Sequence, residues 1–178
     1  MTGNNSELNV YYSGATIIAR LTLKTDQIFL QYTQDWQQSG FAISPHLPLS
    51  GEIPTTNVQW YLRNLLPEED VLETLLSNLH LSKGNTFGII RTLGTDVSGS
   101  FLFLPSDQQL PSTSSLRNIT PSEIENRLDT RDEYSIIFWD GKPRLSMAGV
   151  QDKINVVINS EGQMGFGEGK LISTHILK

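Results

Sequence analysis

Two segments near the end of this 178-residue chain hold residues that could grip a phosphate group. The small residues Ala148 and Gly149 would let backbone N–H groups approach an anion, and a lysine at the end of an apolar strand would add a positive charge. Nucleotide sites of the kinase type combine these two parts. The sequence therefore predicts a nucleotide-phosphate clamp made of Ser146, Met147, Ala148, Gly149, Val150, Gln151 and Lys178.

The residues alone also allow simpler interpretations of both segments. The loop lacks the full G-x-G-x-x-G pattern, so it could be a plain turn between strands, and Lys178 could be a solvated terminal lysine. A second glycine-rich stretch, 165–170, is not a Walker A motif, because Leu171 stands where Ser or Thr would hold magnesium. We predict a flexible hairpin loop there. The three histidines are scattered without ligand spacing, so no metal site is predicted.

The composition is that of an ordinary globular protein, with 38% hydrophobic and 18% charged residues. A net charge of −6 disfavours direct nucleic-acid binding by the chain as a whole. Cysteine is absent, which excludes disulfides and thiolate metal sites and suits a reducing compartment. The N-terminus has no apolar signal region and no window is apolar enough to span a membrane. We therefore expect a cytoplasmic protein with no membrane contact.

The elements of the first half form an antiparallel meander followed by helices. Strands are predicted over 8–12, 15–23 and 27–32, with turn signals between them, and the proline-rich segment 41–54 should be an extended loop. Apolar residues at helical spacing then predict three helices, which cover 58–66, 67–79 and 85–93. An apolar strand over 98–104 ends at Pro105.

The second half should be a separate region of β-structure behind a linker. We divide the chain into 1–105, a linker at 106–118, and 119–178. Thr120, Pro121 and Glu123 form a capping-box signal for one helix that continues through Ile124 and Leu128. Strands are expected over 136–139, 154–158 and 171–177, with turns at Asp140–Gly141 and Glu161–Gly162. The predicted fold class is α+β.

Five motifs, in this order along the chain, resemble the amino-terminal half of the HipA family, the toxin kinases of bacterial type II toxin–antitoxin systems. They are ISPHLPL at 43–49, NLLP at 64–67, LGTDVSGS at 93–100, RLSMAGVQDK at 144–153 and STHILK at 173–178. Together they cover the chain from about residue 8 to its last residue. The resemblance implies an amino-terminal subdomain, made of the meander and helices, followed by part of a kinase-like N-lobe sheet.

The resemblance also implies a function and a set of roles. Typical members use ATP and Mg²⁺ to phosphorylate a translation component, glutamyl-tRNA synthetase, and so cause growth arrest or persistence. A small HipB-like helix-turn-helix antitoxin restrains them. In the family the loop at Ser146–Gln151 covers the nucleotide phosphates, its serine (here Ser146) can be autophosphorylated to silence the kinase, and Lys178 matches the nucleotide-binding lysine.

The functional carboxylates of the family's carboxy-terminal lobe have no matching positions in this sequence. We therefore assign no catalytic residue and no metal ligand, and expect the chain alone to bind ATP weakly and to be inactive. Its partner would be the missing carboxy-terminal lobe, or a separate HipA-type kinase chain. One alternative is an inactive regulatory or antitoxin-like protein that binds such a kinase in trans. Another is the product of a disrupted gene.

Overall fold

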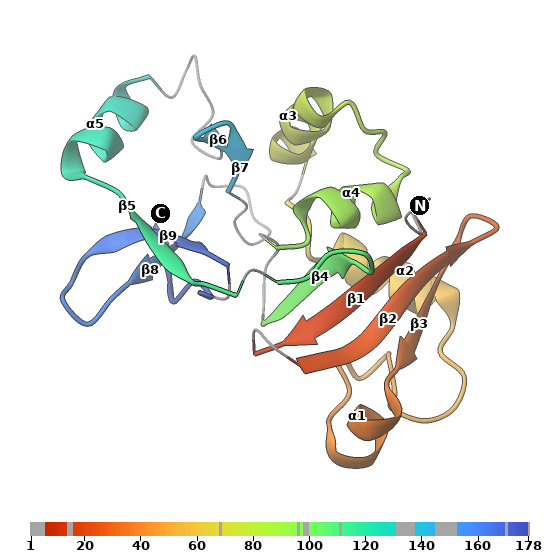
Figure 1. Ribbon diagram of the computed structural model, residues 1–178. Coiled ribbons are helices and arrows are strands. Elements are labelled where there is room, and N and C mark those ends of the chain that lie inside the picture. The colour runs from red at the N-terminus through yellow and green to blue at the C-terminus, as the bar shows by residue number, and fades with distance from the viewer. Residues whose placement is uncertain are drawn as a thin grey trace.

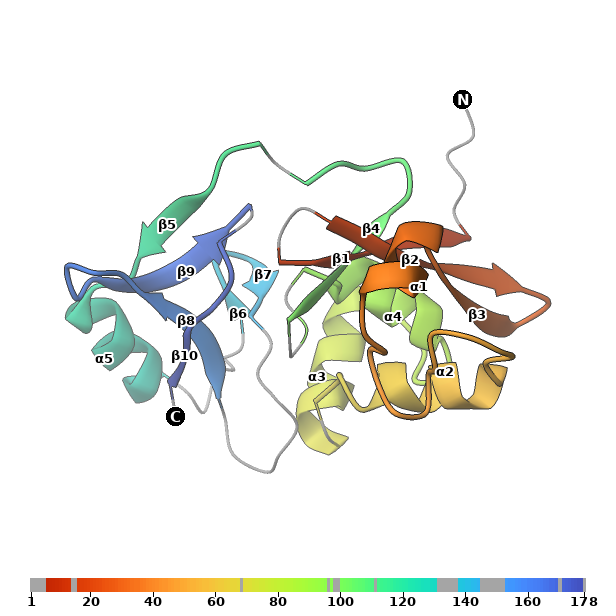
Figure 2. The same cartoon turned by 90° about the horizontal axis from the view of Figure 1, so that it is seen from below.

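The computed structural model in Figure 1 describes the chain at residues 6–13, 16–67, 69–95, 97, 100–110, 112–130, 138–144, 153–169 and 171–177. At residues 69, 70, 142 and 143 it describes the backbone alone. The chain forms two units side by side, each built on a four-stranded antiparallel sheet (Figure 2). Across these ranges, no helix is both long and apolar enough to cross a membrane.

The first sheet confirms the predicted meander and adds a fourth strand to it. Strands β1 (Glu7–Tyr12), β2 (Thr16–Lys24) and β3 (Gln27–Tyr32) pair antiparallel in sequence order, and β4 (Phe101–Pro105) pairs with the other side of β1. The strand order is therefore β3-β2-β1-β4. In β3 buried and exposed residues alternate, which is the period expected of a strand with one face on a core.

Helices α2 (Thr55–Arg63), α3 (Glu69–Leu79) and α4 (Thr86–Leu93) confirm the three predicted helices and lie on one face of this sheet (Figure 2). Helix α2 packs against β3, and α4 packs against β4. Asn85 caps α4, because its Oδ1 accepts a hydrogen bond from the N–H of Gly88 at 2.9 Å. Helices and sheet enclose a core whose fully buried side chains include Leu8, Ile18, Leu62, Leu75, Ile90 and Phe103.

The segment between β3 and α2 contains one short helix, α1 (Gln34–Ser39), which the sequence analysis does not predict. Six residues are too few for an apolar periodicity to be visible. The proline-rich segment 41–54 that follows is a loop, as predicted, but it is not extended throughout, because the N–H of Leu47 donates to the carbonyl of Ser44 at 2.9 Å and closes a tight turn. The Tyr32 hydroxyl ties it to the sheet, since it donates to the carbonyl of Leu47 at 2.7 Å and accepts from the N–H of Ile43 at 2.9 Å.

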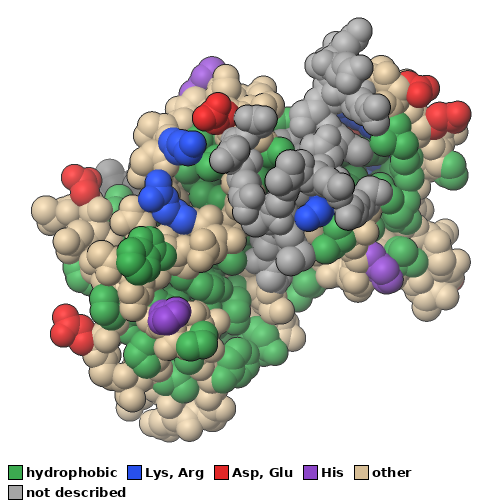
Figure 3. Space-filling model, turned by 180° about the vertical axis from the view of Figure 1, so that it is seen from behind, with side chains coloured by type: hydrophobic (Ala, Val, Ile, Leu, Met, Phe, Trp, Pro, Cys, Tyr) green, Lys and Arg blue, Asp and Glu red, His purple; other side chains and the backbone are tan. Residues whose placement is uncertain are grey.

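Large hydrophobic side chains also remain on the surface of the first unit. Phe41 is 46% exposed and Trp60 on α2 is 65% exposed. Figure 3 shows several hydrophobic side chains gathered on the rear of this unit. A folded protein leaves many apolar atoms in contact with water, so single exposed residues do not by themselves mark a binding site.

The chain crosses from β4 to the second unit in a long connection, which arches over the top of Figure 2. The second sheet has the order β10-β8-β9-β5. Its strands are β5 (Ser115–Asn118), β8 (Ile154–Ile158), β9 (Met164–Glu168) and β10 (His175–Leu177). Helix α5 (Pro121–Asp129) lies beside this sheet, and the core of this unit contains Ile119, Trp139, Ile154, Val156 and Phe166.

Helix α5 (Pro121–Asp129) confirms the predicted capping box. The Thr120 Oγ1 accepts from the N–H of Glu123 at 3.2 Å, and the Glu123 carboxylate accepts from the N–H of Thr120 at 2.9 Å. Ile124 turns toward the core, whereas Leu128 is 47% exposed. The start of α5 is therefore fixed by local chemistry, and Ile124 is the apolar residue of α5 that packs on the core.

Two strands fall in segments that the sequence analysis treats as irregular. Strand β5 lies within the proposed linker at 106–118, and β9 replaces the flexible hairpin loop predicted over 165–170, so that loop prediction is wrong. The glycines of β9 serve close packing instead of flexibility. A Cβ atom on Gly165 would lie 2.3 Å from the carbonyl oxygen of Arg117 on β5, and Gly167 is crowded in the same way.

A two-stranded hairpin stands between the two units. Strands β6 (Phe138–Trp139) and β7 (Lys142–Pro143) pair only with each other among the described strands, and their turn at Asp140–Gly141 is as predicted, with φ of 53° and 71°. Phe138 packs against the core of the first unit, while Trp139 belongs to the core of the second. The predicted strand over 136–139 begins outside the described residues, and the one over 171–177 is shorter than predicted.

Gly94, which follows α4, is sterically restricted. A Cβ atom there would lie 2.2 Å from the carbonyl oxygen of Phe103, and the Gly94 carbonyl also accepts the N–H of Phe103 at 2.8 Å. We expect Gly94→Ala to lower the free energy of unfolding by about 1–3 kcal/mol, because β4 must move away from the helix end. Urea denaturation measures this change.

Gly84→Ala is the matched control for this substitution. Gly84 lies in the turn before α4, and a Cβ atom there meets nothing within 4 Å. Its urea midpoint should stay close to that of the unmodified chain. Equal midpoints for the two alanine variants would contradict the steric argument.

Candidate functional site

The residues of the predicted phosphate clamp lie outside the described residues. They are Ser146, Met147, Ala148, Gly149, Val150, Gln151 and Lys178. The structure does describe the chain on either side of them. Arg144 follows strand β7, Lys153 precedes strand β8, and Leu177 is the last described residue of β10.

The sheet brings two of these borders together. Strands β10 and β8 are antiparallel, and Leu177 is paired with Ile154. Leu177 precedes Lys178, and Ile154 follows Lys153, so the segment after the loop and the segment before the predicted lysine are neighbours. Leu177 also packs against the core of the second unit, which fixes how the strand alternates there.

Hydrogen bonds also fix the approach to β10. The N–H of Thr174 donates to the carbonyl of Val156 at 3.0 Å, and the Thr174 hydroxyl accepts from the N–H of Ile158 at 3.1 Å. The same hydroxyl lies 2.8 Å from Nδ1 of His175. The pairing with β8 therefore begins before the first residue of β10 and continues to its end.

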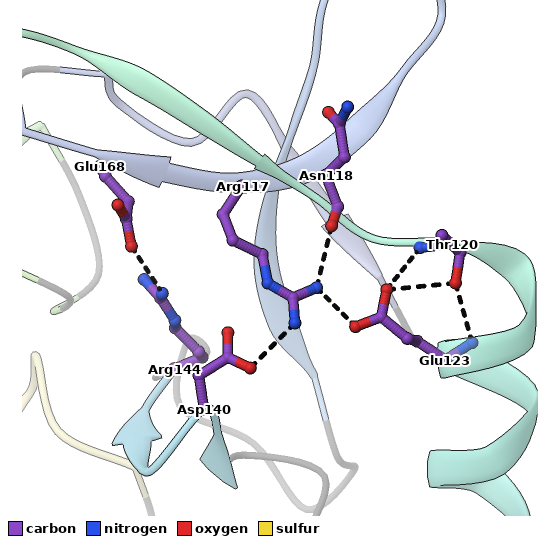
Figure 4. A network of polar contacts seen from close by, with 7 residues as sticks. All are labelled: Arg117, Asn118, Thr120, Glu123, Asp140, Arg144 and Glu168. Atoms are coloured by element: carbon purple, nitrogen blue, oxygen red, sulfur yellow. Dashed lines mark hydrogen bonds and ion pairs between the residues drawn. The ribbon is translucent and has the colours of Figure 1, made fainter.

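Arg144, at the start of the loop, is a buried cation with 6% of its surface exposed. Its guanidinium carbon lies 4.4 Å from the centre of the Phe166 ring, and its Nη2 lies 3.5 Å from Oε1 of Glu168. Figure 4 shows this side chain reaching from the hairpin to β9. A buried charge is tolerated only when it is paired, and here an aromatic face and a carboxylate both contact it.

Arg117 on β5 is the centre of a second polar cluster (Figure 4). Its Nη1 lies 2.7 Å from the Glu123 carboxylate and donates to the carbonyl of Asn118 at 2.9 Å. Its Nη2 donates to Oδ1 of Asp140 at 2.8 Å. One guanidinium thus links strand β5, the first turn of α5 and the turn of the β6–β7 hairpin.

The contacts of this cluster shift two ionisation equilibria. The hydrogen bond from the Thr120 N–H, followed by that from Arg117, holds the pKa of Glu123 below its ordinary value of 4.5. The hydrogen bond to Glu123 is the largest cause that raises the pKa of Arg117. Both groups therefore stay charged throughout the neutral range, and the cluster persists as a set of charge-assisted hydrogen bonds.

Sequence reasoning did not identify this cluster. Arg117 fell in the proposed linker, Glu123 was assigned only its capping role, and Asp140 only a turn. The short distance along the chain between Arg117 and Glu123 could have suggested the first contact. Asp140 is 23 residues from Arg117 in sequence, and no local pattern indicates that pair. Within the described ranges, no group of three or more His, Cys, Asp or Glu residues could hold a metal ion.

Comparison with known proteins gives consistent matches. A family model described as the HipA N-terminal domain matches residues 8–104. The serine/threonine-protein kinase toxin HipA of Shewanella oneidensis is 45% identical over 153 residues, which cover 86% of this chain and 35% of that protein. A Sinorhizobium fredii protein named as a kinase, Y4mE, is 26% identical over 179 residues, covering 96% of this chain and 42% of that protein.

A solved structure matches as well. HipA of Shewanella oneidensis MR-1, in a toxin–antitoxin complex with HipB and operator DNA, superimposes with a TM-score of 0.77 and 42% sequence identity. The match covers 95% of this chain and 39% of that chain. This chain therefore spans less than half the length of the relatives that it matches.

The Glu123 carboxylate gives a prediction about acid stability. We expect Glu123→Gln to lower the free energy of unfolding by about 1 kcal/mol near neutral pH, because it weakens the cap and the contact with Arg117. The folded-state pKa of Glu123 is depressed, so its contribution is present above the pKa of the unfolded chain and is lost as the pH falls through the folded-state pKa. The difference in urea midpoint from the unmodified chain should shrink as the pH falls below 4.5.

Glu125→Gln controls for the loss of a negative charge on the same helix. Glu125 is an exposed residue of α5, and its substitution should leave the midpoint nearly unchanged at neutral pH. A Glu123→Gln effect that is independent of pH would contradict the assignment of the stabilisation to the ionised carboxylate.

Proposed function

The chain belongs to the HipA family, and from this premise we propose that it is the nucleotide-gripping amino-terminal part of a serine/threonine-protein kinase toxin of a type II toxin–antitoxin system. The pairing of Leu177 with Ile154 carries the proposal. It sets the end of β10, which leads to Lys178, beside the start of β8, which follows the loop. A phosphate-covering loop and a strand-borne lysine must meet in this way to hold one ligand.

Each part of the clamp has a defined task in this proposal. The loop from Ser146 to Gln151 covers the β- and γ-phosphates of ATP, with Ala148 and Gly149 allowing its N–H groups to approach the oxygens. Lys178 pairs with the phosphates as a point charge and orients them. Lys153 borders the loop and adds a positive charge there in a chain whose net charge is −6, whereas the charge of Arg144 is met by Glu168.

The proposal assigns this chain no catalytic residue. When bound, ATP supplies the phosphoryl group and Mg²⁺ neutralises charge on its oxygens. Lys153, which precedes β8, is a cation that suits the phosphates, and the described residues contain no group of three or more His, Cys, Asp or Glu that could hold Mg²⁺. We propose that the metal ligands and the base that accepts the proton of the substrate hydroxyl belong to a carboxy-terminal lobe.

The substrate and partners follow from the same premise. We propose that the complete kinase phosphorylates a translation component such as glutamyl-tRNA synthetase in the bacterial cytoplasm, and so causes growth arrest or persistence. A HipB-type helix-turn-helix antitoxin would restrain it. The matched Shewanella structure is a complex of HipA with HipB and operator DNA, which supports a partner of this type.

In a second candidate function, the chain binds a kinase but takes no part in phosphoryl transfer. The first unit, which includes β4, has its own hydrophobic core, and the family-model match lies entirely within it. Such a unit could act in trans, as a regulatory or antitoxin-like protein that binds a separate HipA-type kinase. Radiolabelled ATP distinguishes the two candidates. The kinase proposal expects phosphoryl transfer only when a carboxy-terminal lobe is present, whereas the regulator would reduce transfer by a complete kinase.

Ser146 gives the prediction that tests the clamp. Phosphorylation would add about −1.5 to −2 charges at the predicted phosphate site, so autophosphorylation would oppose ATP binding. We expect Ser146→Asp to weaken ATP binding about tenfold or more, through like-charge repulsion. Equilibrium binding of labelled ATP, with the chain joined to or mixed with a kinase carboxy-terminal lobe, measures the change.

Ser160→Asp is the matched control, because Ser160 is exposed in the turn between β8 and β9. It adds the same charge to the same unit away from the predicted clamp and should leave ATP affinity within about twofold. If Ser146→Asp and Ser160→Asp bound ATP equally well, the loop would not be the phosphate site.

A further inference from the structure

Strand β3 forms one edge of the first sheet, and its pairing with β2 fixes which of its backbone groups point outward (Figure 1). The N–H of Thr33, which directly follows β3, donates to the carbonyl of Ile18 at 2.8 Å. Hydrogen-bonded positions recur at every second residue of an antiparallel pair, so every second residue back from Thr33 also bonds with β2. The N–H and C=O groups of Ile28 and Leu30 therefore point away from β2, and among the described strands β3 has no second neighbour.

This edge lacks the features that usually keep an edge strand from pairing with another chain. Such strands are commonly protected by a charged side chain, a proline or a bulge. The sequence of β3, QIFLQY, contains no charge and no proline, and its pairing with β2 runs without a shift in register. Phe29, on the face of β3 that points away from the core, is 41% exposed. Strand β3 can therefore accept a further strand.

A groove with a volume of about 570 Å³ opens beside this edge. Residues 27 and 29–31 of β3 line it together with Thr22 and Lys24 of β2, and the segment 52–56, which leads into α2, forms the facing wall. The outward backbone groups of a strand recur about every 7 Å, which is twice the rise per residue. An extended peptide has donors and acceptors at the same spacing. The groove therefore suits an extended chain better than a small molecule.

The size of the edge disfavours a second copy of this chain as the occupant. A strand of six residues offers an edge about 20 Å long and about 5 Å wide, or roughly 100 Å². Each partner of a stable complex between folded proteins buries about 800 Å². A single peptide gains more from the same site, because it contacts both walls of the groove.

The side chains of the groove indicate what such a peptide contains. Phe29 has Thr22 as its cross-strand neighbour on one side, and a peptide residue on the other side would cover its ring, which favours an apolar side chain there. Lys24 is paired with Gln27, at the start of β3, so the last residues of an antiparallel peptide would lie near its ammonium group. A carboxylate is favoured at that end. Glu52 on the facing wall keeps the groove from attracting anions in general.

We propose that the edge of β3 and the facing segment 52–56 bind an extended segment of a partner protein, which adds an antiparallel strand to the first sheet. This segment carries an apolar side chain beside Phe29 and a carboxylate toward its C-terminal end, near Lys24. It has no proline where it pairs with Ile28 and Leu30, because its N–H groups must donate there. The groove lies entirely on the first unit, so the inference does not rest on the proposed phosphate clamp.

Selection of peptides by the full chain, from a phage-displayed library of random heptapeptides, tests the site. The selected peptides are synthesised and their affinities are measured by fluorescence anisotropy. We expect Phe29→Lys to weaken their binding about tenfold or more, although the added positive charge should attract a carboxylate, because the apolar contact is lost and the edge is now charged.

Leu128→Lys is the matched control for this substitution. Leu128, on α5 of the second unit, is an apolar residue of similar exposure at 47%, and its substitution adds the same charge away from the groove. It should leave the affinities within about twofold. A selection that enriches no peptide, or peptides that bind the two lysine variants equally well, would overturn the proposal.

Hydrogen exchange, followed by NMR at single amides, tests the geometry. In the free chain the amides of Ile28 and Leu30 should exchange quickly, and those of Phe29 and Gln31 slowly, because only the second pair bonds with β2. A selected peptide should slow exchange at Ile28 and Leu30 about tenfold or more and leave Phe29 and Gln31 unchanged. Slow exchange at Ile28 and Leu30 in the free chain would overturn the proposal, because the edge would already be covered. Protection of Gln31 in Phe29→Lys shows that this variant is folded.

Analytical ultracentrifugation tests the rival occupant. We expect the same sedimentation for the unmodified chain and for Phe29→Lys at every concentration. A concentration-dependent dimer that Phe29→Lys abolishes and Leu128→Lys retains would show that a second copy occupies the edge, and the proposed peptide site would fall.

Discussion

The arrangement of the second unit depends on how two adjacent residues, Phe138 and Trp139, point. Neighbouring side chains on a strand face opposite ways, so a strand of two residues can contact two different layers. Phe138 packs on the core of the first unit and Trp139 in the core of the second. The predicted phosphate loop begins shortly after this hairpin. The hairpin that precedes the loop therefore contacts the cores of both units.

The sizes of the interactions show which of them sets this position. Complete burial of one large apolar side chain stabilises a protein by about 1.5–3 kcal/mol. A partly exposed ion pair such as Arg117 with Asp140 contributes about 0–1 kcal/mol. The burial of Trp139, together with the partial burial of Phe138, therefore places the hairpin, and the Arg117 cluster orients its turn. The two kinds of contact have these different roles because hydrogen bonds depend on direction more strictly than apolar contacts do.

The sequence predicted those features whose cause is local. Three of them depend only on residues close together in the chain: the capping box at Thr120, the Asn85 cap and the apolar stripe of α3. The structure contains all three elements. Strands β5 and β9 could not be predicted in that way. Each depends on a partner distant in the chain, and the glycines of β9 look like a loop signal until the close approach of Arg117 is seen.

The candidate site likewise contains residues that could be predicted from the sequence and contacts that could not. The loop and Lys178 were identified from residue type and family order, and both lie outside the described residues. The contacts of Arg144, which lies beside the loop in sequence, are not predicted. Arg144 stands beside the loop in sequence, but its burial becomes meaningful only with Phe166 and Glu168, which are more than 20 residues further along the chain. No single window of sequence contains that contact.

If the segment after Arg144 is the phosphate loop that we propose, it faces a physical conflict. Strand pairing would hold the loop firmly, but it would use the backbone N–H groups that must remain available to the ligand. Such a loop is best held at its borders. One border continues directly into β8, at the centre of a sheet, where backbone pairing does no harm. At the other border the chain leaves a hairpin of two-residue strands, and the side chain of Arg144 reaches across to β9 instead. Its burial would be costly for an unpaired cation, and the ring of Phe166 and the carboxylate of Glu168 are the contacts that make this burial tolerable.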